Sequence, residues 1–357
     1  MKPIRRSLSA WSALAAIAAA QFTSAASAEP LTYFTWAGYD DPAFRKPFTD
    51  KHGADSVEFS FFSSPDEAFA KLKAGFKADV AHSCIHDIPK WKEAGLIKPI
   101  DTSKLDNWDD LIPALRDAPA VHIDGQQWMI PWEWGASSVI YRADKVNLPE
   151  ESYEVLIDPA YQGRTALADA FDEAYQLSAI LAGVKDPLNL EESEYAAVEE
   201  KMRQLRSNAR FIWTEPSQLE QAMASGEIDA AWGWPNSFAS LRKQNVDVKF
   251  MLQPKEGLVT WQCGFTIPAT SDAPEEQVYD FIDALEDPSS GQALVNNFGY
   301  GHSNAKALEM VDKARLQELG LAGDANETIK SGNLMGPMPE KQRQRLVEMW
   351  TLIKAGG

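Results

Sequence analysis

Hydrophobic and polar positions alternate between two periodicities over the first hundred residues after position 28. Apolar side chains recur at every second residue or in short runs where strands are expected, and at helical spacing between them. The pattern predicts strands at residues 31–36, 56–62 and 77–81, and helices at residues 41–52, 65–76 and 88–93. Strand, helix, strand, helix, strand is typical of a parallel sheet in an α/β protein.

The same alternation returns in the second half of the chain. It predicts strands at residues 127–131, 137–142, 209–213, 228–232, 248–252 and 259–267, and helices at residues 171–181, 216–225, 274–285 and 340–354. We find no repeat and no Pro/Gly-rich linker, so the two α/β units are expected to be lobes joined by strands and facing a cleft. The predicted division is lobe 1 at residues 29–138 and 262–308, lobe 2 at residues 139–261, and a C-terminal helical segment at residues 309–357 that packs on lobe 2.

The N-terminus has the three parts of a cleavable secretory signal. Lys2, Arg5 and Arg6 are basic, residues 11–20 are apolar, and small residues end at Ala28. The apolar run is shorter than the ~20 residues that a bilayer requires. We therefore predict a signal peptide at residues 1–28, cleavage after Ala28 and a periplasmic protein; a buried N-terminal helix fits this pattern less well.

The net charge and the lack of a second long apolar stretch limit the partners that the protein can have, and the two cysteines raise the question of a disulfide. The formal net charge of −18 repels nucleic acid and anionic lipid, so no nucleic-acid partner is expected. No second apolar stretch approaches membrane-spanning length, so no stable membrane insertion is expected either. The two cysteines, Cys84 and Cys263, permit one disulfide in an oxidising compartment, and two free buried thiols are the alternative.

Aromatic residues gather where ligands bind in open parallel sheets, beyond the carboxyl ends of the strands. Trp36, Tyr39 and Trp234 follow predicted strands, and Trp132 and Trp134 lie in the loop predicted before a crossover strand. Aromatic faces attract cations at ~0.5–2 kcal/mol per contact. Each residue taken alone is as well explained as a core anchor, but the cluster as a whole favours a site for an ammonium group.

Acidic and metal-binding side chains offer further candidates near the same edge. Glu173 lies in the first turn of the helix at residues 171–181, where acidic residues usually serve as caps. His82, Cys84 and His86 are acceptable zinc or copper ligands at alternate positions, but the chain enters a helix and the spacing is expected to break after Cys84. We therefore expect no metal and no cofactor. The chain has no nucleophile elbow, zincin or phosphate-loop motif, and we predict that it is not an enzyme.

Seven short segments, in their order and spacing, resemble the spermidine/putrescine-binding proteins of bacterial ABC transporters. They are residues 36–39, 94–101, 130–135, 233–234, 254–257, 267–268 and 298–304, and the resemblance extends from residue 31 to residue 354. It implies a type II periplasmic-binding-protein fold, with two α/β lobes hinged by crossover strands and a ligand cleft between them. It also implies a monomer whose partners are a small-molecule amine ligand and a membrane permease.

The same resemblance implies a set of ligand-binding residues: Trp36, Tyr39, Ser83, Trp134, Glu173, Trp234, Trp261, Cys263 and Tyr300. The aromatic members match residues that enclose a polyamine chain, Ser83 matches a polar contact, and Glu173 matches an acid that binds an amine. Cys263 departs from the pattern, because polyamine binders have an aspartate at that position, and Ala170 replaces a second acid. These departures favour a mono-cation or a zwitterion over a diamine. One alternative is a protein of the same fold that binds an anionic or neutral solute. The other is a secreted metal-binding protein or metal-dependent enzyme.

Overall fold

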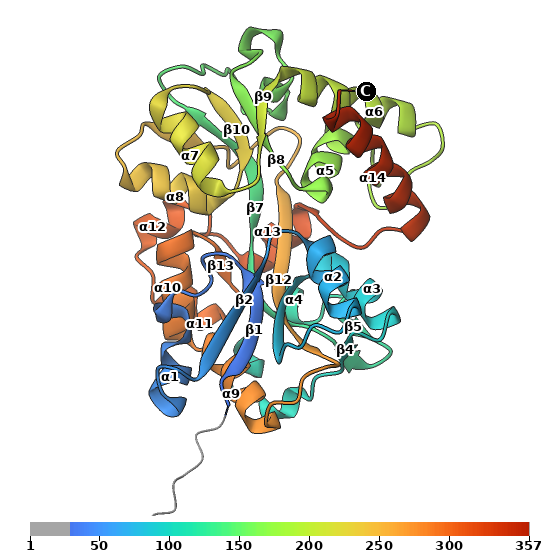
Figure 1. The fold of residues 1–357 in the computed structure, drawn as a ribbon. Coiled ribbons are helices and arrows are strands. Elements are labelled where there is room, and N and C mark those ends of the chain that lie inside the picture. The colour runs from blue at the N-terminus through green and yellow to red at the C-terminus, as the bar shows by residue number, and fades with distance from the viewer. Residues whose placement is uncertain (1–28, 357) are drawn as a thin grey trace, which may run out of the picture.

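The computed structural model describes residues 29–356, and the predicted signal peptide at residues 1–28 lies outside this part of the chain. The chain folds into two α/β halves, one below the other in Figure 1, which share one long, curled path of hydrogen-bonded strands. Strand order along this path is β2-β1-β3-β12-β7-β10-β8-β9.

The lower half in Figure 1 contains the three N-terminal strands, which are parallel as predicted. They are β1 (Leu31–Trp36), β2 (Val57–Phe62) and β3 (Val80–Cys84), with β1 in the middle. The helices of this half are α1 (Lys46–His52), α2 (Pro65–Lys73), α3 (Ile88–Glu93), α4 (Pro113–Arg116), α9 (Glu275–Leu285), α10 (Pro288–Phe298) and α11 (Ala305–Glu309). The predicted start of α2 is confirmed: Ser64 Oγ accepts the backbone N–H of Glu67, and Pro65 is the first helical residue.

The upper half repeats the parallel arrangement. Its strands are β8 (Thr165–Ala168), β9 (Ala209–Trp213) and β10 (Ala230–Gly233), with β8 in the middle. Its helices are α5 (Phe171–Leu181), α6 (Tyr195–Asn208), α7 (Pro216–Ser225), α8 (Pro235–Lys243) and α14 (Glu340–Lys354). The predicted limits of the helices at 171–181, 216–225 and 340–354 agree with α5, α7 and α14.

Two long strands connect the halves. The first part of β7 (Ile130–Arg142) pairs with β12 (Val259–Pro268), and its last part pairs with β10 and β11 (Val248–Phe250). The prediction of two separate strands with Trp132 and Trp134 in a loop was wrong, since both lie within β7. Strands buried on both faces lose the alternation of apolar and polar residues that marks a half-buried strand.

The third predicted strand also differs from the observed one. The sequence pattern predicts it at residues 77–81, but β3 extends to Cys84, so His82, Ser83 and Cys84 lie inside the sheet and not in a loop after it. The position of β3 between β1 and β12 buries all five of its residues. Polar side chains in such a strand find their partners within the sheet, which the sequence pattern does not reveal.

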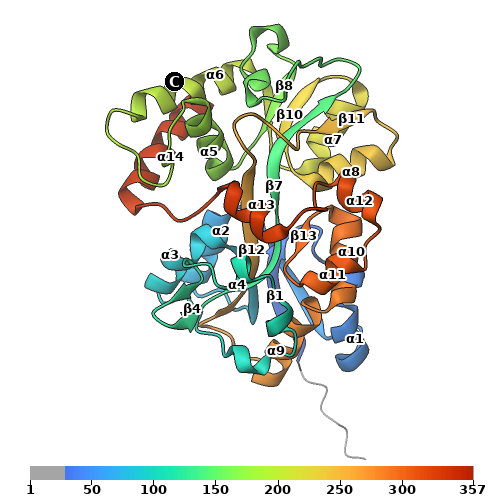
Figure 2. The ribbon, with the colours of Figure 1, turned by 180° about the vertical axis from the view of Figure 1, so that it is seen from behind.

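The C-terminal segment crosses the junction of the two halves. Helix α12 (Lys313–Glu318) and helix α13 (Ala325–Ser331) lie near the junction in Figure 2, and β14 (Asn333–Leu334) pairs with β12. The chain then reaches α14, which packs against α5 and α6.

Short elements complete the fold. The remaining strands are β4 (Ile97–Lys98), β5 (His122–Ile123), β6 (Gln126–Gln127) and β13 (Gly301–His302). The 3-10 helices are η1 (Pro42–Arg45), η2 (Ile85–Asp87), η3 (Thr102–Lys104), η4 (Trp108–Asp110), η5 (Tyr153–Leu156) and η6 (Pro159–Tyr161).

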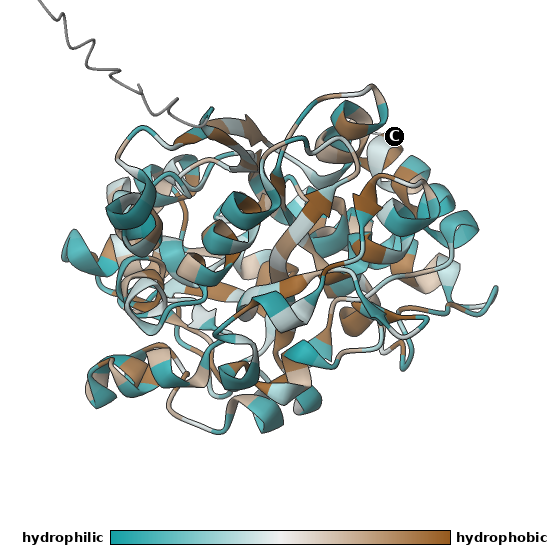
Figure 3. Cartoon of the chain, turned by 90° about the horizontal axis from the view of Figure 1, so that it is seen from below, coloured by the Kyte–Doolittle hydropathy of each residue, from teal (hydrophilic) through white to brown (hydrophobic). Residues whose placement is uncertain are grey.

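Apolar residues concentrate in the strands and on the inner faces of the helices, and polar residues on the outer helix faces (Figure 3). One large cluster of buried side chains contains residues of both halves, and a second, smaller cluster lies under α2 and α3. In the part of the chain that the structure describes, five tryptophans are fully buried: Trp91, Trp132, Trp213, Trp232 and Trp350. Among residues 29–356, no helix combines the length and the apolar character that a membrane crossing needs.

Candidate ligand-binding site

Glu173 is a buried carboxylate at the start of α5, and three neutral groups hold it. Its Oε1 accepts hydrogen bonds from Ser137 Oγ at 2.7 Å and from Trp234 Nε1 at 2.9 Å. Its Oε2 accepts one from Trp232 Nε1 at 2.6 Å. Burial raises the pKa of Glu173, and the three donors oppose that rise. These bonds orient the carboxylate rigidly without a positive charge to balance it.

The order of the chain explains how these donors meet. Ser137 belongs to β7, while Trp232 and Trp234 stand at the end of β10, which pairs with β7. The ring of Trp234 lies edge-to-face on Trp213, with centroids 4.8 Å apart. Trp234, a predicted ligand-binding residue, thus lies beside Glu173, and the Trp213 ring fixes the orientation of its indole. Trp232, which the same strand-end rule indicates, and Ser137 are not among the predicted binding residues.

A second buried carboxylate, Glu133, was also missed. It lies on β7 and is 2 % exposed. Its Oε1 accepts a hydrogen bond from the Tyr39 hydroxyl at 2.5 Å and lies 3.3 Å from His82 Nε2. Its Oε2 is buried without a hydrogen-bond partner. The signal was present in the sequence, because Glu133 is the one charged residue in the otherwise uncharged stretch from residue 130 to residue 141.

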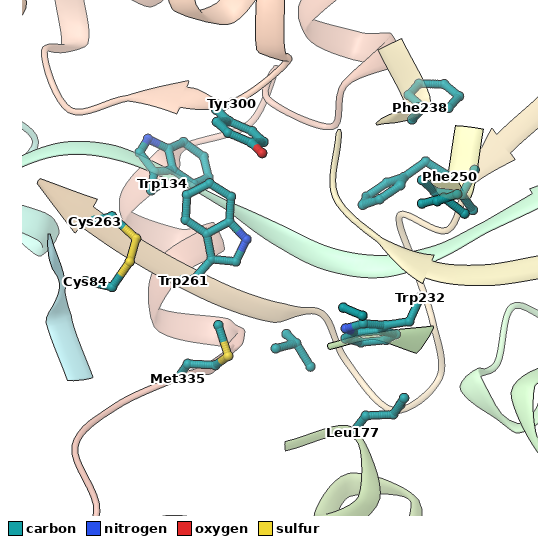
Figure 4. Close-up of a cluster of buried hydrophobic side chains, with 14 of the residues drawn as sticks. Cys84, Trp134, Leu177, Trp232, Phe238, Phe250, Trp261, Cys263, Tyr300 and Met335 are labelled. Carbon is teal, nitrogen blue, oxygen red and sulfur yellow. A yellow bond between two sulfur atoms is a disulfide. The ribbon is translucent and has the colours of Figure 1, made fainter. Parts of the chain in front are cut away.

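Trp261 and Tyr300 form an aromatic wall beside β7. Their rings meet edge-to-face with centroids 4.8 Å apart, and Figure 4 shows both next to Trp134. The Trp261 ring lies so close to Gly135 that a Cβ there would come within 2.5 Å of Trp261 Cζ2. The pKa of the Tyr300 hydroxyl is raised by burial, then by the charges of Glu133 and Glu173. Tyr300 therefore lies within electrostatic reach of both carboxylates.

Trp134 supports this wall from the lower half. Its Nε1 donates to the backbone oxygen of His302 at 3.3 Å, and its ring covers Gly301, where a Cβ would lie 2.3 Å from Trp134 Cε2. Trp134 is 2 % exposed. These contacts make it a fixed part of the wall.

Two further predicted residues are engaged by other side chains in this structure, and their roles in binding stay a prediction. Trp36 packs against Phe62 with ring centroids 4.5 Å apart, as part of the smaller cluster under α2 and α3. Ser83 is 2 % exposed and donates a hydrogen bond within the sheet to Thr266 Oγ1 at 3.4 Å. The structure thus groups Tyr39, Trp261 and Tyr300 around the two carboxylates, but gives Trp36 and Ser83 partners of their own.

Cys263 and Cys84 form a disulfide, which resolves the question that the sequence left open (Figure 4). Cys263 stands opposite Glu133 in the pairing of β12 with β7. Within residues 29–356, the donor atoms close enough to hold a metal belong to His82, Glu133 and Cys263, and the sulfur of Cys263 is already bonded. The alternative set of His82, Cys84 and His86 is not assembled.

A group of charged side chains links the halves beside the site. Arg343 of α14 lies 3.2 Å from Asp66 of α2 in the lower half and 3.6 Å from Asp172 of α5 in the upper half. His86 Nε2 lies 3.5 Å from Asp87 and 4.0 Å from Asp172. Asp172, in the first turn of α5, thus joins a cluster of charged residues that links the two halves.

Two α/β halves connected by long strands, with carboxylates and aromatic rings meeting at their junction, define a two-lobed binding protein for a small ligand. The chain belongs to the family of bacterial extracellular solute-binding proteins, whose family model matches residues 43–319.

Relatives and solved structures agree with this assignment. The chain is 26 % identical over 353 residues to the putrescine-binding periplasmic protein PotF of Escherichia coli K12, covering 94 % of each chain. It is 28 % identical over 330 residues to the spermidine/putrescine-binding periplasmic protein of the same organism, covering 89 % of this chain and 91 % of the relative. The structure of the spermidine/putrescine ABC transporter substrate-binding protein PotD from Streptococcus pneumoniae matches with a TM-score of 0.76 at 20 % identity, covering 92 % of this chain and 99 % of that one. The predicted periplasmic-binding-protein fold is confirmed.

Proposed function

We propose that this chain is the periplasmic substrate-binding protein of an ABC uptake transporter and that it captures a small, amine-bearing solute. The observation that carries the proposal is Glu173, whose buried carboxylate is bound by three neutral donors. A buried ionised carboxylate is costly unless a cation accompanies it. An ammonium group on the ligand supplies that cation in the bound state.

The aromatic surroundings suit the same ligand. Trp234 donates to Glu173, and Trp261 and Tyr300 form a wall within electrostatic reach of it. Aromatic faces stabilise a nearby ammonium by ~0.5–2 kcal/mol each, with larger values where water is excluded. The alkyl part of an amine fits the same apolar surface. Of the nine predicted binding residues, Glu173, Trp234, Trp261 and Tyr300 therefore have the strongest support.

The proposed receptor works in the periplasm and delivers its ligand to a membrane permease. The signal-like residues 1–28, with cleavage after Ala28, and the periplasmic relatives support export to the periplasm. Closure of two lobes about β7 and β12 provides the signal that a membrane permease recognises. The protein acts as a monomeric, non-catalytic receptor. The lobe limits at residues 29–138, 139–261, 262–308 and 309–357 stay a prediction.

Calorimetric titration of the mature protein with amines tests the role of Glu173. Glu173→Gln keeps the size of the side chain and removes its charge, so affinity for a cationic ligand should fall by ~10- to 100-fold, the worth of a charge-assisted hydrogen bond. Glu220→Gln is the matched control, because Glu220 is a half-buried glutamate of the upper half that bonds Ser240 instead.

A thermal-shift screen over amines, amino acids, anions and neutral sugars finds the ligand class, since a ligand that binds the folded state raises the melting temperature. Stabilisation by an anionic or neutral solute alone, or unchanged amine affinity in Glu173→Gln, would contradict the proposal.

A further inference from the structure

The face of the sheet that carries the disulfide also carries a histidine and a carboxylate. Strand β12 lies between β3 and β7, and Cys263 on β12 is opposite Cys84 on one side and Glu133 on the other. His82 stands two residues before Cys84 on β3, so it shares the same face. Donor atoms of His82, Glu133 and Cys263 accordingly lie within 4.8 Å of one another, and all three residues are buried.

One atom of the histidine and one of the carboxylate are unpartnered. His82 Nε2 and Glu133 Oε2 are buried without a hydrogen-bond partner, which costs free energy. The other atom of each side chain is held, because His82 Nδ1 lies 3.1 Å from Thr35 Oγ1 and Glu133 Oε1 accepts the Tyr39 hydroxyl at 2.5 Å. Outer contacts of this kind orient imidazoles and carboxylates that bind metals.

We propose that reduction of the disulfide creates a four-ligand site for Zn²⁺ at this place. Its ligands are the thiolates of Cys84 and Cys263, Nε2 of His82 and Oε2 of Glu133. In the oxidised protein the two sulfurs are bonded to each other, so the ligand set is incomplete. An external dithiol supplies the two electrons and two protons that convert the disulfide into two thiols, and it is itself oxidised to a disulfide. Zn²⁺ then displaces the two thiol protons.

The types of ligand and their spacing suit zinc. Tetrahedral bonds of ~2.0–2.3 Å place ligand atoms ~3.3–3.8 Å apart, so donors that now lie within 4.8 Å of one another need to move by only ~1 Å. Thiolate and imidazole ligands favour Zn²⁺ over Mg²⁺ and Ca²⁺, which prefer oxygen. The inference does not depend on which solute the protein captures.

Metal titration of the mature protein in its oxidised and reduced forms tests this site. Protein is reduced with a phosphine, freed of it under inert gas and titrated with Co²⁺ and then Zn²⁺. The reduced form should bind one Co²⁺ per chain, with the thiolate-to-cobalt absorption of a tetrahedral site, and Zn²⁺ should displace the Co²⁺. Zn²⁺ should also raise the melting temperature of the reduced form. The oxidised form should show none of these effects.

Substitutions of single ligands and of an outer contact identify the set. Thr35→Val removes the contact that orients His82 and should weaken metal binding by ~10- to 100-fold. His82→Gln and Glu133→Gln each remove a ligand and should weaken it by at least as much. His86→Gln is the matched control, because His86 is close to Cys84 in sequence but is not in the described group of donor atoms. Its metal affinity should equal that of the wild type.

Cys84→Ala tests the site without a reductant, since it frees the Cys263 thiol beside His82 and Glu133. This variant should bind Co²⁺ with a thiolate band. Folded, reduced wild type without such a band overturns the inference, and so does wild-type metal affinity in His82→Gln or in Cys84→Ser/Cys263→Ser. Loss of the folded circular dichroism spectrum in both the reduced wild type and Cys84→Ala also overturns it, because the site needs the folded sheet. Each of these results leaves amine binding by the oxidised protein untouched.

Discussion

Cys84 and Cys263 stand opposite each other on the neighbouring antiparallel strands β3 and β12, and a disulfide joins them. The bond connects the N-terminal sheet to the strand that returns from the upper half, across 179 residues of sequence. Cys263 also pairs with Glu133 on β7, so the disulfide lies beside the lower-lobe carboxylate. It therefore fixes the spacing of the strands that carry the site.

Removing this disulfide should destabilise the protein. A cross-link that closes so long a loop reduces the entropy of the unfolded chain, and its loss typically costs ~2–5 kcal/mol. The double variant Cys84→Ser/Cys263→Ser should therefore unfold at a lower urea concentration than the oxidised wild type. Wild-type protein unfolded in the presence of a reductant is the control and should match the variant. Equal urea midpoints for the oxidised and reduced wild type would contradict this expectation.

Amine binding should depend on pH through Glu173. Burial raises the pKa of Glu173 in the ligand-free protein, and a bound ammonium favours the ionised form, so binding lowers that pKa. Affinity should fall as pH decreases through the raised pKa, and binding near that pH should release protons. Titrations in two buffers of different ionisation enthalpy measure the protons released. Glu173→Gln should remove both effects, and an unchanged pH profile in this variant would exclude Glu173 as the responsible group.

Local signals explain why much of the fold was predictable from the sequence. Helix α5 and helix α14 were placed at their observed limits because apolar residues recur at helical spacing within them. Parallel pairing in each half followed from the alternation of strands and helices. The disulfide, by contrast, depends on the register of β3 against β12, which no short segment encodes.

The site was less predictable because two of its groups, His82 and Glu133, lie in strands that are buried on both faces. The strands predicted from the sequence exclude Glu133 and His82, whereas both residues lie in the sheet and contact each other. The resemblance to polyamine binders led to Glu173 and also to Trp36, whose ring packs on Phe62 and whose role in binding stays a prediction. A charged residue inside an uncharged strand is the signal that would have led to Glu133.

Gly135→Ala should disturb the aromatic wall. A Cβ at this position would lie 2.5 Å from Cζ2 of Trp261 and 3.0 Å from two other ring atoms, so the indole must move away from β7. Overpacking of this kind costs ~1–3 kcal/mol. We expect a lower melting temperature and weaker ligand binding, with quenched or shifted tryptophan fluorescence. Ala136→Gly, one residue along β7, is the control for a backbone effect of the strand. Wild-type affinity in Gly135→Ala would show that Trp261 does not contact the ligand.

His302 should make the protein sensitive to mild acid. It is fully buried and neutral, since Nε2 donates to the Leu285 oxygen at 3.0 Å and Nδ1 accepts the Asn304 N–H at 3.0 Å. Burial lowers the pKa of His302 to about 4. The unfolded chain, with a histidine pKa of ~6.5, therefore binds more protons than the folded one between these values.

Stability contributed by the neutral His302 is present in full above pH ~6.5 and is lost as pH falls through about 4, a decrease of ~3 kcal/mol in the free energy of unfolding. Urea unfolding between pH 4 and pH 7 measures this slope, and His302→Gln should flatten it. His122→Gln is the control because His122 is exposed. Parallel pH curves for the wild type and His302→Gln would show that another group governs acid sensitivity, and an imidazolium signal from His302 in folded protein at pH 6 would show that its pKa is not lowered.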